Sequence, residues 1–243
     1  MKRYGLIGYP LTHSFSQKYF TEKFLREALN DHVYENFPIQ EISALKDVLT
    51  SNHDLFGLNV TIPYKKEVLD YLDECSPAVA AMGACNCIKI VEGKLLGFNT
   101  DVIGFERSLR PFLKPEHTAA LILGTGGAAV AVAYVMDQLG IQYQYVSRQK
   151  TPNSITYAEI DQQTITDHSL IINTTPLGMY PAVNDCPPLP YEHLTSKHHC
   201  FDLIYNPAET LFLQKAAAQN ATVQNGAEML IIQAEESWLI WNL

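Results

Sequence analysis

The chain has 243 residues, of which 47% are hydrophobic and 18% are charged, and its formal net charge is −9 at pH 7. This much apolar material excludes wholesale disorder and can fill either one large domain or two small ones. The acidic balance argues against nucleic acid and anionic membranes as partners, because both repel a negatively charged protein.

The cysteines and the N-terminus indicate the compartment. The five cysteines are irregularly spaced, and their odd number does not suit a disulfide framework. Cys85 and Cys87 form a C-x-C pair rather than the C-x-x-C of zinc ribbons, so we predict buried free thiols and no metal site. The N-terminus lacks the apolar region of a signal peptide, and no stretch is long enough to span a membrane. We therefore expect a cytoplasmic protein.

The first hundred residues alternate strand and helix patterns. Apolar runs predict strands at 3–8, 32–39 and 56–62. Apolar positions at helical spacing predict helices at 14–28, 41–50 and 65–72, the first capped by Ser14 or Ser16. Two further apolar segments, 84–91 and 94–99, flank Glu92-Gly93 and predict a hairpin.

The second half carries a new series of strands and helices. Residues 119–124 form a continuous apolar run, which is typical of a strand buried on both faces. Further strands are predicted at 143–147, 170–175 and 200–205. Helices are predicted at 126–139, 210–219 and 227–243. This alternation predicts an α/β fold with a doubly wound parallel sheet, and a domain boundary near 101–104.

A glycine-rich turn joins the strand at 119–124 to the next helix. Gly124, Gly126 and Ala129 match the pattern G-x-G-x-x-A, in which small residues allow a tight turn, a close approach of pyrophosphate and close helix packing. With Gly127 and Ala128 they form the predicted dinucleotide contacts at a helix N-terminus. The alternative is a glycine-rich turn that holds no ligand.

The next strand indicates which dinucleotide binds. Sites for NAD usually carry an acidic residue after this strand, whereas this chain has Ser147, Arg148 and Lys150. Because Arg148 can pair with a 2′-phosphate, we predict NADP as the cofactor. A solvated basic turn is the alternative.

Polar clusters follow the strands of the first half, at 13–16, 59–65, 83–86 and 97–101. In open α/β sheets ligands bind beyond the carboxyl ends of the strands. Hydroxyls, amides, one lysine and one aspartate gathered there suit a ligand with several hydroxyls and a carboxylate.

These motifs make the chain similar to the shikimate dehydrogenase family along nearly its full length. The resemblance rests on eight segments in order: GYPLTHSFS, NVTIPYK, GACN, GFNTDVIGF, LGTGGAA, NTTPLGM, DLIYNPAETLFL and NGAEMLIIQA. It implies an oxidoreductase that reversibly reduces 3-dehydroshikimate to shikimate, in chorismate and aromatic amino acid biosynthesis, as a monomer or homodimer. It also implies two domains: an α/β substrate-binding domain at 1–101 with the helix at 227–243, and a Rossmann-type NADP-binding domain at 102–226.

The resemblance also implies roles for individual residues. Lys65 and Asp101 correspond to the catalytic pair, and chemistry supports this, because hydride arrival at a ketone makes an alkoxide that a protonated lysine can neutralise. The substrate carboxylate would be bound by Ser14 and Ser16. The substrate ring would meet Thr61, Asn86 and Gln233, with Tyr205 near the cleft. The cofactor would be lined by Thr174, Gly226 and Met229.

Several alternatives stay open at this point. Lys65 has the same pattern as a solvated lysine such as Lys66, Asp101 is able to cap a helix at Val102, and Gln233 is compatible with a core amide bonded to backbone. We expect the histidines, including His13, to be structural. One departure is Cys87, where the family usually has threonine.

Three other functions compete with this prediction. They are a quinate/shikimate dehydrogenase that prefers NAD, a catalytically silent sensor, and a methylene-tetrahydrofolate dehydrogenase with the same two-domain plan. Retention of Lys65 and Asp101 counts against a sensor, and the serine pair counts against the folate enzyme.

Overall fold

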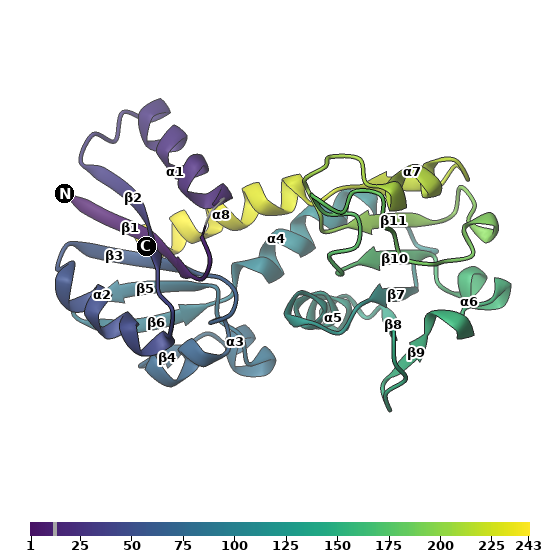
Figure 1. The fold of residues 1–243 in the computed structure, drawn as a ribbon, viewed down its shortest axis with the longest axis horizontal. Coiled ribbons are helices and arrows are strands. Elements are labelled where there is room, and N and C mark those ends of the chain that lie inside the picture. Colours follow the sequence, from purple (N-terminus) through teal and green to yellow (C-terminus); the bar gives the residue numbers. More distant parts are fainter. Residues whose placement is uncertain (12–13) are drawn as a thin grey trace. The chain divides into compact units, whose positions relative to one another are not determined.

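The computed structural model describes residues 1–11 and 14–243, so His13 lies outside the described residues. The chain divides into two compact units, Met1–Ile103 with Gln233–Leu243, and Gly104–Ile232. Within the described residues each unit contains a six-stranded sheet with helices (Figure 1). Both unit boundaries fall inside helices, in α4 (Thr100–Leu109) and α8 (Ala227–Asn242).

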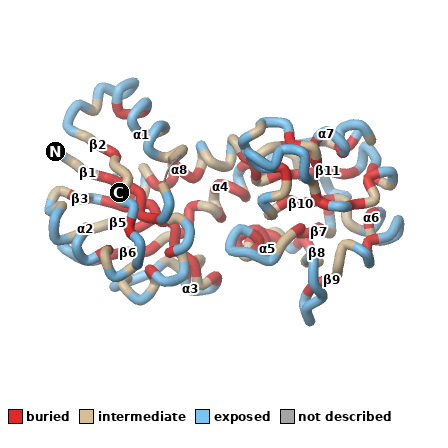
Figure 2. Tube along the Cα trace, in the orientation of Figure 1, coloured by how far each residue is buried: buried red, intermediate tan, exposed pale blue. Residues whose placement is uncertain are grey.

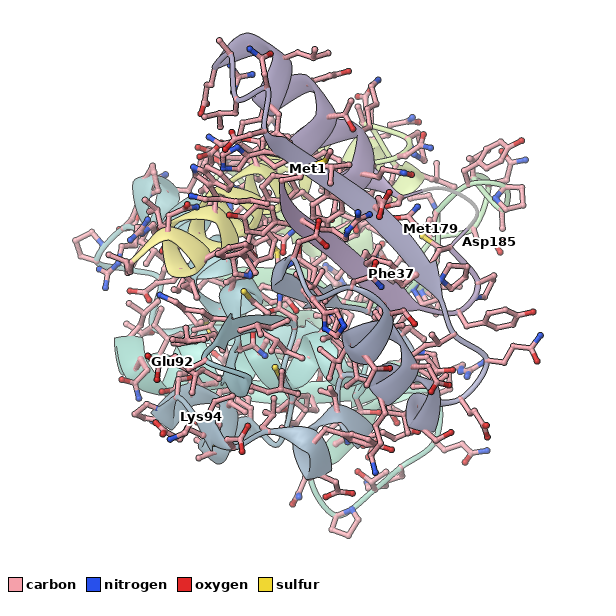
Figure 3. The ribbon with its side chains drawn as sticks, turned by 90° about the vertical axis from the view of Figure 1, so that its left-hand side faces the viewer. Met1, Phe37, Glu92, Lys94, Met179 and Asp185 are labelled. Carbon is pink, nitrogen blue, oxygen red and sulfur yellow. The ribbon has the colours of Figure 1, made fainter. Side chains whose placement is uncertain are left out.

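The sheet of the first unit is mixed, with the strand order β2-β1-β3-β5-β6-β4. Its strands are β1 (Lys2–Gly8), β2 (His32–Pro38), β3 (Leu55–Val60), β4 (Glu74–Cys75), β5 (Cys87–Val91) and β6 (Lys94–Phe98). β1 is parallel to β2 and β3, whereas β5 is antiparallel to β3 and β6. The predicted hairpin is confirmed, with Glu92 and Gly93 at positive φ, and Figure 3 labels Glu92 and Lys94 at this turn.

Two helices of the first unit, α1 (Phe15–Arg26) and α3 (Pro77–Met82), begin at serine side-chain caps. α1 is capped by Ser14, whose hydroxyl accepts from the Gln17 amide at 3.1 Å. The short 3₁₀ turn η1 (Ile42–Ala44) leads into α2 (Leu45–Ser51), as predicted. The helix predicted at 65–72 is only a 3₁₀ turn, η2 (Glu67–Tyr71), and α3 (Pro77–Met82) was not predicted, because six residues are too few to show a helical period.

Both faces of the first sheet are covered. One face packs against α1 and α8, through Tyr4, Phe20, Phe24 and Trp241. The Trp241 indole donates to the Ile88 carbonyl at 3.0 Å, and its ring fills the space where a Cβ on Gly57 would lie. The other face packs against α2 and η2. Figure 2 shows the buried stretches along the strands of this sheet.

The sheet of the second unit is parallel, in the order β12-β11-β10-β7-β8-β9. Its strands are β7 (Ala119–Leu123), β8 (Gln142–Ser147), β9 (Ser154–Thr156), β10 (Leu170–Asn173), β11 (His199–Asp202) and β12 (Thr222–Gln224). The chain runs outward from β7 to β9 and then returns to β10 on the other side of β7. This confirms the predicted doubly wound sheet, with its topological switch point between β7 and β10.

Helices cover both faces of the second sheet, and Phe105 of α4 stacks on Phe201 of β11. α5 (Gly127–Leu139) contacts β7 and β8, while α6 (Gln162–Asp167) and α7 (Leu211–Ala217) contribute to the opposite core. Sequence patterns missed α6, β9 and β12, each of which has six residues or fewer. Across residues 1–11 and 14–243, none of the helices has the length and apolar character that a membrane crossing requires.

Candidate active site

A lysine and an aspartate meet beyond the carboxyl end of β3. The Lys65 ammonium donates to Asp101 Oδ2 at 2.7 Å, and the two side chains are 32% and 20% exposed. The Lys65 carbonyl also accepts from the Cys85 amide at 2.8 Å, which fixes the backbone of this lysine. Lys65 is therefore held beside a carboxylate, unlike the exposed neighbour Lys66.

The Asp101 carboxylate does not cap its helix. Asn99 Oδ1 accepts from the amides of Asp101 and Val102 at 3.1 and 3.4 Å, so Asn99 caps α4. The alternative that Asp101 caps the helix at Val102 is wrong. Asp101 lies instead in the first turn, where the helix dipole favours a negative charge, and its carboxylate faces Lys65.

Two of the predicted ring-binding amides lie around Thr100. Asn86 Oδ1 accepts from the Thr100 amide at 2.7 Å, and Asn86 Nδ2 donates to the Thr100 hydroxyl at 3.1 Å. The Thr100 hydroxyl is also 3.4 Å from Gln233 Oε1. Gln233 is thus buried against a side-chain hydroxyl rather than bonded to backbone, and the structure brings Asn86 and Gln233 together.

The predicted carboxylate-binding serines lie at the start of α1. Ser14 caps the helix, and Ser16 is in its first turn, where the Ser16 hydroxyl interacts with that of Tyr34. Thr61 follows β3, and its amide donates to the Ile7 carbonyl at 3.0 Å. Hydroxyl groups at a helix N-terminus are suited to an anion, because the helix dipole and free amides favour negative charge there.

The glycines in the turn between β7 and α5 have two different roles, one in the fold and one in keeping space open. Gly124 has a φ of +108°, and a Cβ there would lie 2.8 Å from the Thr174 hydroxyl, so the fold itself requires glycine. At Gly126 and Gly127, by contrast, a Cβ would have nothing within 4 Å. These two glycines keep the space before α5 open, although packing does not need them.

The N-terminus of α5 fits a pyrophosphate. Gly126 is its N-cap and makes no side-chain cap, so amides of the first turn are available to a ligand. Ala129 is fully buried, as the close packing of helix and sheet requires, while Ala128 is exposed. The open space, the amides and the buried small residue together match the needs of a dinucleotide.

The basic segment after β8 contains an ion pair that the sequence did not reveal. Lys150 pairs with Glu159, and together with Thr156 it holds the pKa of that carboxyl at about 2. The Ser147 hydroxyl donates to the Gln149 carbonyl. Arg148 is exposed and forms no ion pair with any residue in the described part of the chain, so Arg148 is the free cation of this segment.

The ends of β10 and β11 are joined by a buried carboxylate, which sequence reasoning missed. Asp202 accepts from Asn173 Nδ2 at 3.0 Å, from the Ile204 amide at 3.1 Å and from the Thr210 hydroxyl at 2.6 Å. Burial raises the pKa of Asp202 to about 6. The Thr210 hydroxyl also caps α7, so one carboxylate fixes three elements.

Two further predicted cofactor residues, Thr174 and Gly226, lie next to the segments that this carboxylate joins. The Thr174 hydroxyl donates to the Leu123 carbonyl at 2.7 Å. A Cβ on Gly226 would overlap the Leu203 carbonyl, so the start of α8 touches the segment after β11. Tyr205, a predicted substrate contact, is exposed, and Met229, a predicted cofactor contact, is half-buried. Figure 3 labels Met179 and Asp185 in the long loop that follows β10.

The cysteines are free thiols, with Cys85, Cys87 and Cys200 buried, Cys186 half-buried and Cys75 exposed. In the part of the chain that the structure describes, no group of three or more His, Cys, Asp or Glu side chains is arranged to hold a metal ion.

A doubly wound sheet with a glycine turn at its switch point, joined to an α/β unit with a lysine–aspartate pair, defines a two-unit oxidoreductase of the dinucleotide-binding class. Residues 6–88 match the family model for the shikimate dehydrogenase substrate binding domain. The chain is 34% identical to the shikimate dehydrogenase (NADP(+)) of Caldicellulosiruptor bescii, over 99% of this chain and 89% of that protein. The chain belongs to the shikimate dehydrogenase family, as predicted.

Solved structures agree with this assignment. The shikimate 5-dehydrogenase of Thermus thermophilus, in complex with NADP(H) and shikimate, is 31% identical with a TM-score of 0.85, covering 99% of this chain and 92% of that one. The enzyme of Listeria monocytogenes, in complex with shikimate and NAD, is 26% identical with a TM-score of 0.90, covering 100% and 92%. The predicted fold class, a Rossmann-type unit with an α/β substrate-binding unit, is confirmed.

Proposed function

We propose that this chain catalyses the reversible NADP-dependent reduction of 3-dehydroshikimate to shikimate, a step of aromatic amino acid biosynthesis. The observation that carries the proposal is the 2.7 Å contact between Lys65 and Asp101 in a chain of this family. A sensor would have no use for a paired ammonium at this position, because binding alone moves no proton.

The proposed mechanism assigns the proton to Lys65. The dinucleotide, when bound, supplies the hydride that reduces the ring ketone. The Lys65 ammonium donates a proton to the oxygen on which negative charge develops, and recovers that proton in the oxidative direction. Asp101 orients the ammonium by accepting its hydrogen bond.

The substrate would be held mainly by neutral donors. Ser14 and Ser16 at the start of α1 would bind the carboxylate, and Thr61, Asn86 and Gln233 would meet the ring hydroxyls. This choice suits a protein with a net charge of −9, because local hydroxyl and amide donors, aided by the helix dipole, can bind an anion without a basic surface. Tyr205, in the second unit, stays a predicted substrate contact.

The cofactor would be held in the second unit. The amides at Gly126, Gly127, Ala128 and Ala129, beyond the turn at Gly124, would bind the pyrophosphate. Arg148 would pair with the 2′-phosphate, with Ser147 and Lys150 beside it. Thr174, Gly226 and Met229 would lie toward the nicotinamide.

The two units then have separate tasks. The unit Met1–Ile103 with Gln233–Leu243 would bind the substrate and carry the proton transfer, and the unit Gly104–Ile232 would bind NADP. Free thiols suit a reducing compartment, so we place the enzyme in the cytoplasm. The enzyme would act as a monomer or homodimer.

The test is absorbance at 340 nm with the purified protein, shikimate or quinate, and NADP or NAD. The proposal predicts the highest kcat/KM with shikimate and NADP. Faster turnover of quinate or of NAD would instead identify the rival dehydrogenase. Tight binding of shikimate without turnover under any combination would identify a sensor.

A further inference from the structure

A chain of buried side-chain hydrogen bonds runs through the first unit behind the predicted ring-binding residues. The Tyr34 hydroxyl donates to Asn59 Oδ1 at 2.8 Å, and Asn59 Nδ2 donates to Ser237 Oγ at 2.9 Å. These side chains come from β2, β3 and α8 and are 5% exposed or less. Because buried polar groups are costly unless bonded, such a network fixes the side chains that it includes.

The Ser237 hydroxyl has one proton and can therefore donate only one hydrogen bond. The Ser237 hydroxyl donates to the Gln233 carbonyl of its own helix at 2.9 Å. Its oxygen therefore acts as an acceptor toward Asn59 Nδ2 at 2.9 Å and toward Thr100 Oγ1 at 3.3 Å. A hydroxyl oxygen has two lone pairs and can accept both hydrogen bonds.

Thr100 also has one proton, but three oxygens compete for it. They are Asn86 Oδ1 at 3.3 Å, Gln233 Oε1 at 3.4 Å and Ser237 Oγ at 3.3 Å. Asn86 Oδ1 already accepts the shorter bond from the Thr100 amide at 2.7 Å, which makes it a weaker acceptor for a second bond and leaves Gln233 and Ser237 as the stronger competitors. If Thr100 donates to Gln233, one of the two lone pairs of the Gln233 amide oxygen is used within the protein, and this oxygen becomes a weaker acceptor for a ligand.

We propose that Ser237 is a positioning residue that accepts the Thr100 proton and so keeps both lone pairs of the Gln233 amide oxygen available, which makes this oxygen a stronger acceptor for a hydroxyl of the substrate ring. This inference rests on the proposed function and names the contact that Ser237 protects. Ser237 touches no substrate itself, since it is fully buried beneath Thr100 and Gln233.

The test replaces Ser237 by alanine, with Ser108→Ala as the matched control. Ser108 is an equally buried helical serine, but its hydroxyl donates to the Phe105 carbonyl of its own helix at 3.0 Å, outside the network. In Ser237→Ala we expect the KM for shikimate to rise by about threefold and by no more than about tenfold, because one hydrogen bond to the substrate is weakened. The kcat and the KM for NADP should change less than about twofold, as for lost uniform binding. Ser108→Ala should leave all three constants unchanged.

A double-mutant cycle separates positioning from general destabilisation. In a Gln233→Ala background, Ser237→Ala should raise the KM for shikimate no further, because the oxygen that Ser237 protects is gone. Ser237→Thr, which keeps the hydroxyl, should restore the wild-type KM. If Ser237→Ala does not fold, as judged by thermal unfolding, Ser237→Cys serves instead, because a thiol is a weak acceptor.

The two failures are distinguishable. A wild-type protein that does not oxidise shikimate overturns the proposed function, and this inference with it. If the wild-type protein is active and a folded Ser237→Ala variant keeps its KM for shikimate, or shows the same rise in the Gln233→Ala background, only the inference is overturned.

Discussion

Lys65 and Asp101, 36 residues apart in the sequence, form a hydrogen-bonded ion pair of 2.7 Å at the start of α4. The pair is possible because Asn99 provides the helix cap and leaves the Asp101 carboxylate available. Proton delivery and helix capping thus depend on neighbouring but different side chains, which makes the two tasks separable by mutation.

Replacement of Lys65 by alanine should lower kcat by about 10²–10⁴-fold, the usual contribution of a general acid–base residue. The matched control is Lys66→Ala, which removes an exposed lysine from the next position and should keep nearly wild-type kcat. Steady-state assays with shikimate and NADP check both. Normal turnover in Lys65→Ala would remove this residue from the mechanism.

Replacement of Asn99 by alanine should mainly affect stability. The loss of the cap should lower the free energy of unfolding by about 0.5–2 kcal/mol. Asp101→Asn, which leaves the Asn99 cap in place, should lower kcat with a smaller loss of stability. Urea unfolding of both variants checks the difference, and an equal loss of stability would contradict the assignment of the cap to Asn99.

Replacement of Gly126 by alanine should impair cofactor binding without impairing the fold. Its Cβ would meet nothing in the protein but would enter the space before α5, so we expect the KM for NADP to rise about tenfold by overpacking against the ligand. Gly226→Ala is the contrasting variant, because its Cβ would overlap the Leu203 carbonyl and should lower the unfolding temperature. An unchanged KM for NADP in Gly126→Ala would mean that no ligand approaches this turn.

Replacement of Arg148 by alanine should weaken NADP but not NAD. Loss of a charge-assisted contact to the 2′-phosphate should raise the KM for NADP about tenfold, while the KM for NAD stays nearly constant. Lys150→Ala should have a smaller effect, since Lys150 is paired with Glu159. Equal changes with both cofactors would show that Arg148 does not recognise the 2′-phosphate.

A buried histidine should make stability depend on pH. His199 is 1% exposed and stacks on Phe112, and burial lowers its pKa to about 4. An unfolded histidine binds its proton near pH 6.5. The unfolded state therefore binds more protons below that value, and stability should fall as the pH drops from about 6.5 toward 4. In His199→Gln, thermal unfolding measured between pH 4 and 8 should lack this part of the decrease.

The sequence predicted those elements that are determined by neighbouring residues in the chain. β7 was predicted because a strand buried on both faces must be continuously apolar, and the turn at Gly124 because its φ of +108° strongly favours glycine. The elements α3, α6, β9 and β12 escaped because packing, rather than periodicity, stabilises such short segments.

The site residues, too, were predictable only where a local sequence motif contained them. Lys65 lay within a recognisable motif, but Ser237 did not, because its contact with Asn59 joins positions 178 residues apart. Between Asn99 and Asp101, both good N-cap residues, only coordinates could decide which one caps α4. Similarly, no sequence pattern linked Lys150 to Glu159.

The contact of Trp241 with Gly57 and Ile88 has a consequence for biosynthesis. A ribosome makes β3 and β5 first, then all of Gly104–Ile232, and only afterwards the helix whose indole completes their core. At usual rates of translation this gap lasts on the order of ten seconds. During that interval the earlier strands carry uncovered apolar surface, so the nascent polypeptide should be a client for chaperones until α8 emerges.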